Sequence, residues 1–388
     1  MKRLALVIVV AVGTWAGAEE PDQAQMDFAN GLFQRGLFKE AVEEYRAYLT
    51  QFPQGKYVST ALYRLGEAEY AGGNQSGALE AFDKLLGSPD LESAVQQQAS
   101  ARRGEVLYRL KRYDEARPVL EPLAAPELPP DVRARALYYL GKLHFDQNNP
   151  AEALNALKRL VDELPEHALA PYARFQVGFV YLALNDTQNA AIAFGEVAKS
   201  APDAELRMES RFRAAEAYDK IGWYDAAAAA YEQLRQEFPD SVYAERAMYG
   251  HAWASYHAGK VENAAALAAE FLAKYTNSER TAGVKYLQAN CQQQQKKYAE
   301  ALELYRAIEA QFATSEFALR AKYKIAWAQY LNGNVQEAKT AIMEFLEKHK
   351  DSAWVGDASF LLGSILAAEG NFEDAYEEFR LVAEKYTA

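Results

Sequence analysis

The 388-residue sequence has little of the chemistry that most enzymes and metalloproteins use. It contains one cysteine, Cys291, so no disulfide can form within the chain and no cysteine cluster can hold a metal. None of its five histidines has the spacing of a metal-binding helix. The sequence also lacks a glycine-rich phosphate loop and a nucleophile with a neighbouring base. These absences indicate that the protein is not an enzyme and that it binds no metal and needs no cofactor.

Long apolar stretches are equally scarce. The one continuous apolar run, residues 4–12, is too short for a membrane-spanning helix of about 20 residues. Lys2 and Arg3 precede this run and the small residues 16–18 follow it, a pattern typical of a cleaved secretory signal. We therefore predict a signal peptide over residues 1–18 and a periplasmic mature protein that does not span the membrane; an uncleaved anchor is the alternative.

Basic residues are outnumbered by acidic ones, and the formal net charge is −12. An acidic surface is repelled by the phosphates of nucleic acids and by anionic lipid headgroups. The charge therefore excludes nucleic acid as a partner.

Against these absences stands a regular recurrence of alanine. The marker alanines occupy positions 41, 78, 116, 153, 190, 227, 264, 301, 338 and 375, at intervals of 37 residues except for one of 38. A period of this size is typical of a solenoid, in which each repeat buries its apolar face on the next. The sequence therefore predicts ten stacked repeats.

Each repeat has the pattern of two helices, A and B, joined by a tight turn. Twelve residues before the marker stands Gly or Ala in every repeat, which lets two helices approach closely. Five residues before the marker, eight of the ten residues are Gly or Asn, which tolerate the left-handed backbone that ends a helix. Apolar residues four and seven positions after the marker continue the buried face of helix B. Four repeats end helix B with proline: Pro53, Pro165, Pro202 and Pro239.

The third repeat departs from this pattern because it is rich in proline. The prolines are Pro118, Pro122, Pro126, Pro129 and Pro130. An interior proline destabilises a helix by about 3 kcal/mol or more. We therefore expect a short or kinked helix B and an irregular joint at 118–132, which would divide the repeats into 19–132 (repeats one to three) and 133–388 (repeats four to ten).

The combination of small residue, marker alanine with an apolar residue four positions later, and terminal proline resembles the tetratricopeptide repeat (TPR). The junction between repeats six and seven, Phe238-Pro239-Asp240-Ser241-Val242-Tyr243-Ala244, is similar to that of envelope TPR proteins such as the Tol-Pal-associated cell-division coordinator and the outer-membrane assembly lipoprotein. The resemblance implies an all-α, right-handed superhelical solenoid of about ten helix-turn-helix repeats. It also implies that helix A lines a concave groove that binds other proteins.

Candidate binding residues therefore lie on helix A. Repeats seven and nine carry the same four residue types on one helix face: Arg246, Tyr249, Trp253 and Tyr256, and Arg320, Tyr323, Trp327 and Tyr330. Between them, repeat eight supplies Tyr286, Asn290 and Gln293. Aromatic and arginine side chains dominate binding hot spots, and amides hydrogen-bond peptide backbones. We expect two aromatic walls and an amide floor, with the alternative that these residues only pack the groove.

Three functions are compatible with this pattern. The first is an exported adaptor that binds a segment of another envelope protein, as the resemblance to Tol-Pal and outer-membrane assembly proteins implies. The second is a polysaccharide-export or peptidoglycan-associated scaffold that stacks glycan on Trp253 and Trp327. The third is the N-terminal TPR part of a larger protein, because the sequence stops after helix B of repeat ten and no polar capping helix follows.

Overall fold

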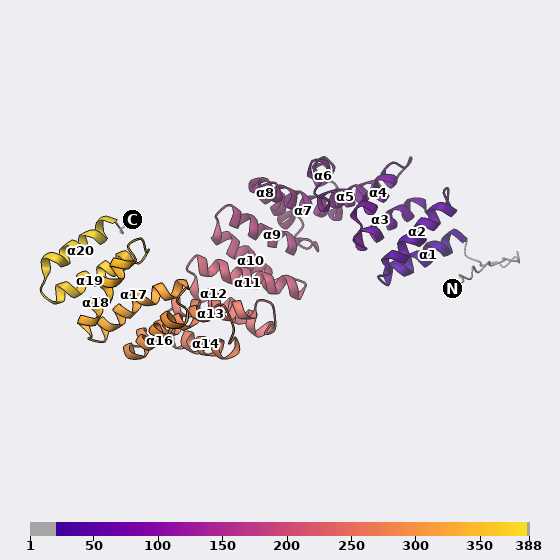
Figure 1. Cartoon of the computed structure of the whole chain (residues 1–388). Coiled ribbons are helices and arrows are strands. Elements are labelled where there is room, and N and C mark those ends of the chain that lie inside the picture. The colour runs from indigo at the N-terminus through magenta and orange to yellow at the C-terminus, as the bar shows by residue number, and fades with distance from the viewer. Residues whose placement is uncertain (1–20, 386–388) are drawn as a thin grey trace. The chain divides into compact units, whose positions relative to one another are not determined.

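The computed structural model describes residues 21–385, and throughout this range the chain is built from helices and short turns (Figure 1). No strand occurs among these residues, and none of their helices is long and apolar enough to cross a bilayer. The predicted signal peptide, residues 1–18, lies outside them. The chain separates into two compact units, with the boundary between Val180 and Tyr181.

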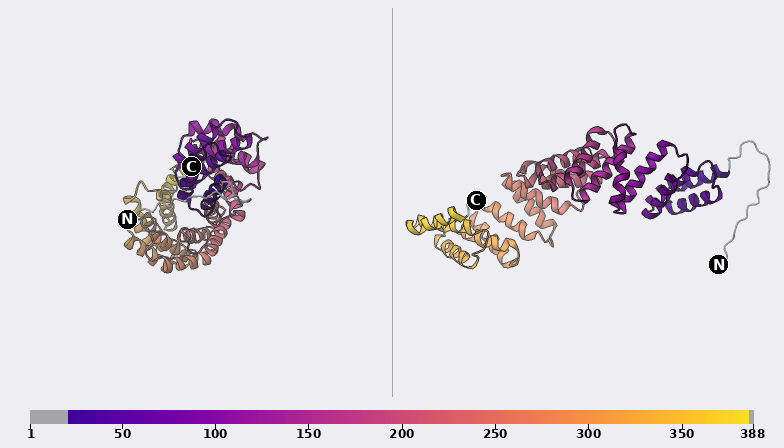
Figure 2. Two further views of the ribbon diagram at one scale, coloured as in Figure 1. Left: turned by 90° about the vertical axis from the view of Figure 1, so that its right-hand side faces the viewer. Right: turned by 90° about the horizontal axis from the view of Figure 1, so that it is seen from above.

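The helices pair as A and B of ten consecutive repeats. The first unit contains α1 (Pro21–Gln34), α2 (Phe38–Gln51), α3 (Val58–Ala71), α4 (Gln75–Leu86), α5 (Ser93–Arg109), α6 (Tyr113–Leu120), the 3₁₀ helix η1 (Glu121–Ala124), α7 (Pro130–Asp146) and α8 (Pro150–Glu163). The boundary falls within α9 (Ala170–Ala183). The second unit continues with α10 (Thr187–Ser200), α11 (Ala204–Lys220), α12 (Tyr224–Glu237), α13 (Ala244–His257), α14 (Val261–Lys274), α15 (Thr281–Gln294), α16 (Tyr298–Gln311), α17 (Glu316–Leu331), α18 (Val335–Lys348), α19 (Val355–Ala368) and α20 (Phe372–Lys385). Within that unit, Figure 2 shows the pairs following one another along an arc.

The contact between helices A and B depends on the two small residues of each repeat. All ten marker alanines lie on helix B and are at most 3% exposed. Opposite them, a Cβ added to Gly66 would lie 2.7 Å from the ring of Phe82, and one added to Gly104 would collide with Leu120. Glycine is therefore required at these two positions, which confirms the predicted contact point.

The turn between the two helices is left-handed in every repeat. The residue five positions before the marker has a positive φ in all ten cases, between 59° and 85°. Eight of these residues are Gly or Asn, as expected, but Lys111 and Lys296 adopt the same conformation. The turn geometry is thus imposed by the packing of the two helices, and these lysines tolerate a backbone that favours glycine.

The ends of helix B also agree with the sequence. Helices α2, α8, α10 and α12 each end two residues before the proline that was expected to stop them. In the third repeat, α6 has only eight residues and continues as the four-residue η1, so the predicted short helix B is found. Helices α5 and α7, the A helices of repeats three and four, pack directly against each other there. The division of the repeats at residue 132 stays a prediction.

Candidate binding groove in the second unit

A cavity of about 800 Å³ opens on the second unit. Most of its lining comes from α11, α13, α15 and α17, the A helices of repeats six to nine. We call this cavity the second-unit groove. Four successive A helices reach it because each repeat places the same helix face in the same direction.

Seven of the eleven residues singled out from the sequence line this groove: Arg246, Tyr249, Trp253, Tyr256, Tyr286, Asn290 and Arg320. The other four, Gln293, Tyr323, Trp327 and Tyr330, are not part of its lining. Trp327 is half-buried instead, with its ring centroid 6.3 Å from that of Tyr330 and its side chain against the core cluster that contains Tyr323. The structure therefore brings the residues of repeats seven and eight together, and from repeat nine it adds Arg320.

Trp253 is the centre of an aromatic wall. Its ring is nearly parallel to those of His257 and Tyr286, with centroids at 5.7 and 6.4 Å. Tyr249 and Tyr256 meet it edge-on, at 6.3 and 6.1 Å. Such ring pairs contribute about 0.5–1.5 kcal/mol each beyond the area that they bury. Trp253 is thus held firmly by its neighbours and only part of its indole is exposed.

The amides expected as a floor are partly engaged within the protein. Asn290 is 8% exposed, and its Oδ1 accepts a hydrogen bond of 2.6 Å from the buried hydroxyl of Tyr305. The same hydroxyl lies 3.2 Å from Oε1 of Gln293. Burial raises the pKa of Tyr305, so this hydroxyl keeps its proton and remains a donor. The amide of Asn290 is therefore largely engaged within the protein, because its side chain also hydrogen-bonds Tyr286.

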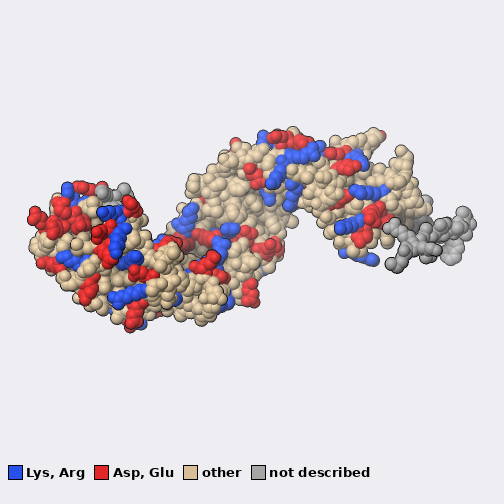
Figure 3. Space-filling view, viewed as in Figure 1, with Lys and Arg blue, Asp and Glu red and all other residues tan. Residues whose placement is uncertain are grey.

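Charged side chains frame the aromatic wall, mostly as neutral pairs. Arg246 lies 2.7 Å from Glu216 and its guanidinium sits 4.4 Å from the ring centroid of Phe212. Arg320 pairs with Glu316 at 2.6 Å. On the surface of the second unit in Figure 3, acidic and basic side chains are likewise interspersed. Such half-exposed pairs add little stability, so a charged ligand can compete for them at small cost.

Two groove charges are not part of any such pair. Asp219 on α11 and Lys324 on α17 line the groove, and neither forms an ion pair within residues 21–385. Burial raises the pKa of Asp219, partly offset by His257, and burial lowers the pKa of Lys324, partly offset by Asp357. Both shifts have the same cause, the loss of water around a charge without a close partner.

A second row of groove residues, not predicted from the sequence, lies at the junctions between repeats. Arg280, Phe317 and Trp354 line the groove, and together with Tyr243 they occupy the position 21 residues before the marker in repeats seven to ten. Each aromatic member contacts the aromatic residue on helix A of the preceding repeat: Phe212–Tyr243, Tyr286–Phe317 and Tyr323–Trp354, with centroids at 4.4, 5.7 and 6.1 Å. In repeats three to six the same position holds Val95, Val132, Leu169 and Leu206. This change from aliphatic to aromatic or arginine residues was a signal available in the sequence.

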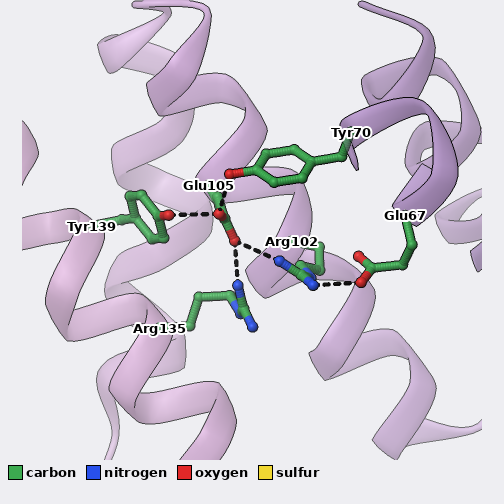
Figure 4. Close-up of polar contacts among 6 residues, drawn as sticks. All are labelled: Glu67, Tyr70, Arg102, Glu105, Arg135 and Tyr139. Carbon is green, nitrogen blue, oxygen red and sulfur yellow. Dashed lines mark hydrogen bonds and ion pairs between the residues drawn. The ribbon is translucent and has the colours of Figure 1, made fainter. Parts of the chain in front are cut away.

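The first unit uses equivalent positions in another way (Figure 4). Glu105, which is 3% exposed, accepts hydrogen bonds from the hydroxyls of Tyr70 and Tyr139 at 2.6 and 2.5 Å. The same carboxylate pairs with Arg102 and Arg135, and Arg102 also pairs with Glu67. Burial alone would raise the pKa of Glu105, but Arg135, Arg102 and the two hydroxyls hold it below the usual range. These contacts join α3, α5 and α7 into one polar network.

No group of three or more metal-binding side chains was found anywhere in residues 21–385. The lone thiol, Cys291, is fully buried, and burial raises its pKa to about 12, so it stays protonated and unreactive. The groove itself presents aromatic surface, amide groups and charges of both signs.

The sequence matches two family models. Residues 26–92, 101–168 and 138–205 match the tetratricopeptide repeat, and residues 204–295 and 285–380 match the outer membrane lipoprotein family YfiO. The second match covers the repeats that carry the groove. No curated protein matches the sequence.

Solved structures of similar fold include other TPR proteins. PilF of Pseudomonas aeruginosa is 20% identical, with a TM-score of 0.46 over 58% of this chain and 95% of that one. MamA of Desulfovibrio magneticus RS-1 is 28% identical, with a TM-score of 0.39 over 46% and 93%. A TPR protein of Parabacteroides merdae is 19% identical, with a TM-score of 0.40 over 65% and 92%.

The all-helical repeats with their left-handed turns and buried marker alanines agree with the family matches along the chain. Repeats of this kind serve protein–protein interaction. The chain is a tetratricopeptide repeat protein whose second unit is similar to an outer membrane lipoprotein family.

Proposed function

We propose that this protein is an exported scaffold of the bacterial cell envelope that holds a segment of another envelope protein in the second-unit groove. The observation that carries the proposal is the groove itself, about 800 Å³ with aromatic and arginine residues from consecutive repeats. A concave site of this size and composition suits a peptide segment, since aromatic and arginine anchors provide most of the energy in such contacts. The match of residues 204–380 to an outer membrane lipoprotein family supports the envelope setting.

An extended or helical protein segment suits the groove better than a glycan. A sugar-binding platform needs an open aromatic face, whereas four rings within 6.4 Å surround Trp253. The groove charges are suited to the charged side chains of such a segment. Because of the family resemblance, we also propose that the partner belongs to the Tol-Pal machinery or to an outer-membrane assembly complex. Binding of peptidoglycan or an exported polysaccharide is the alternative.

Two tryptophans at the same repeat position provide a matched experiment. Trp253 lines the groove and Trp327 does not, although both stand eleven residues before their marker alanine. Envelope proteins captured by the mature protein are compared with those captured by Trp253→Ala and Trp327→Ala, with helicity and melting temperature measured for each.

We expect Trp253→Ala to lose one specific protein partner, while Trp327→Ala keeps it. If both folded variants retain every partner, or lose the same ones, the groove does not bind the partner. Loss of retention on peptidoglycan or exopolysaccharide, with all protein partners kept, would favour the glycan alternative.

A further inference from the structure

We infer that the second-unit groove selects an extended peptide by its charge order, with a basic residue at the α11 end and an acidic residue at the α17 end. This inference rests on the proposed function and adds the chemistry of the ligand. It follows from which groove charges the protein neutralises by itself and which it leaves for a ligand.

Most charges in the groove are already balanced within the protein. Arg246 has Glu216 at 2.7 Å, and Arg320 has Glu316 at 2.6 Å. Arg280 reaches Glu245 at 3.1 Å. With these pairs set aside, Asp219 and Lys324 are the charged residues that distinguish one end of the groove from the other.

Asp219 marks the α11 end with a carboxylate that lacks a close partner. Its Oδ1 is buried and has no hydrogen-bond partner within the described chain. His257 is near enough to influence it electrostatically, yet the two side chains form no ion pair. A buried acceptor without a donor is unfavourable, and more so when it is charged. An ammonium or guanidinium group of a ligand would remove that cost.

Lys324 marks the α17 end with the opposite charge. It is half-buried, and the nearest aromatic ring is that of Tyr323, with the centroid 5.5 Å from Nζ. Asp357 acts on it only from beyond ion-pair distance. A carboxylate placed here by a ligand would gain more than on an open surface, because less water screens the pair.

The spacing of the two charges sets a length for the ligand. Helices α13 and α15 lie between α11 and α17 in the order of A helices. Three steps of about 8–10 Å between neighbouring helices give about 24–30 Å. An extended chain rises about 3.3 Å per residue, so the two ligand charges should be about seven to nine residues apart. Tyr249, Trp253 and Tyr286 line the stretch between them, so apolar or aromatic residues should fill it.

The test uses a random dodecapeptide phage library against the full mature protein. The variants are Asp219→Asn and Lys324→Gln, and Asp240→Asn is the control because Asp240 is exposed and does not line the groove. Wild type should enrich peptides with Lys or Arg about seven to nine residues from Asp or Glu. Asp219→Asn should lose only the basic preference and Lys324→Gln only the acidic one, each weakening the best wild-type peptide about tenfold. Asp240→Asn should change neither.

Exchanging the charges of Asp219 and Lys324 gives a stricter test of the charge order. The double variant Asp219→Lys with Lys324→Asp should enrich peptides of the reversed charge order, which a merely structural role of either residue cannot produce. If wild type enriches peptides that Trp253→Ala does not bind, but without any charge preference, the inference is overturned and the proposed function stands. If wild type enriches no peptide beyond Trp253→Ala, the proposed function fails and the inference fails with it.

Discussion

The two units are built from the same repeat but use the same face of helix A differently. The clearest difference lies at the position eleven residues before the marker alanine. In repeat three this position is Glu105, the centre of a buried network in which the carboxylate meets two arginines and two tyrosine hydroxyls. In repeats seven and eight it is Trp253 and Asn290, which line a cavity of about 800 Å³. Helix A ends in a left-handed turn in all three repeats, although helix B is short only in repeat three. The residue types on helix A therefore decide whether that face is closed by its own contacts or left open for a ligand.

The largest expected effect comes from breaking the closed face. Glu105→Ala leaves Arg102 and Arg135 without their shared carboxylate in a buried site, which should destabilise the first unit by about 3–5 kcal/mol. Glu216→Ala removes the half-exposed partner of Arg246 at the same repeat position and should cost at most about 1 kcal/mol. Chemical denaturation followed by hydrogen exchange in each unit measures both. Equal losses for the two variants would show that the faces do not differ as described.

A second variant tests the close helix contact of the first unit. A Cβ at Gly104 collides with Leu120, so Gly104→Ala should destabilise the protein by about 2 kcal/mol. Gly31→Ala is the matched control, because nothing lies within 4 Å of a Cβ there, and it should stabilise α1 by up to about 1 kcal/mol. Thermal unfolding of the two variants should shift in opposite directions. A shift in the same direction would contradict the role given to the small residue.

The units should also respond differently to mild acid. His251 in the second unit is 6% exposed, and burial, together with Arg235 and Lys260, lowers its pKa to about 4. Its ordinary pKa is about 6.5, so the unfolded chain takes up the proton first and stability falls as the pH drops from about 6.5 towards 4. By pH 5 the loss should be about 1–2 kcal/mol, and His251→Gln should abolish this dependence.

In the first unit, burial lowers the pKa of His144 less strongly than that of His251, and the Glu105 network has the same sign with a lower window. The pKa of Glu105 is lowered, so its contribution is complete above the ordinary pKa of a glutamate and is lost only as the pH falls below about 4.5. Hydrogen exchange at pH 7 and pH 5 separates the two units. Loss of protection in the first unit before the second would contradict this order.

The smallest expected effect is a gain in stability at the left-handed turns, and it should be equal in the two units. Lys111 and Lys296 have φ values of 59° and 61° and stand one in each unit. Replacing either by glycine should stabilise its turn by about 1 kcal/mol, because glycine has no steric cost in this region. Lys297→Gly, next to Lys296 but with φ of −88°, should not stabilise the protein. Unequal effects of Lys111→Gly and Lys296→Gly in thermal unfolding would mean that the turns differ between units.

The sequence was sufficient for most of the fold because a period of 37 residues repeats each local signal ten times. The sequence was less informative about the groove. Whether a residue lines the groove depends on which side chain of the next repeat packs against it. Trp253 is fixed by Tyr286 of the following repeat, whereas the corresponding residue after Trp327 is Phe360, which pairs with Phe379 instead. Identical residues on one helix face can therefore have different surroundings. The second row of groove residues, which includes Trp354, could have been found by aligning the repeats at the junctions between them as well as along their helices.

The most direct test of the account compares the two faces in the cell. A photo-crosslinking amino acid is placed at Tyr249 or at Tyr138, which both stand fifteen residues before their marker alanine, one in each unit. We predict a covalent adduct with a discrete envelope protein at position 249 and none at position 138. Adducts of equal yield at both positions, or at position 138 alone, would contradict the assignment of the binding face to the second unit.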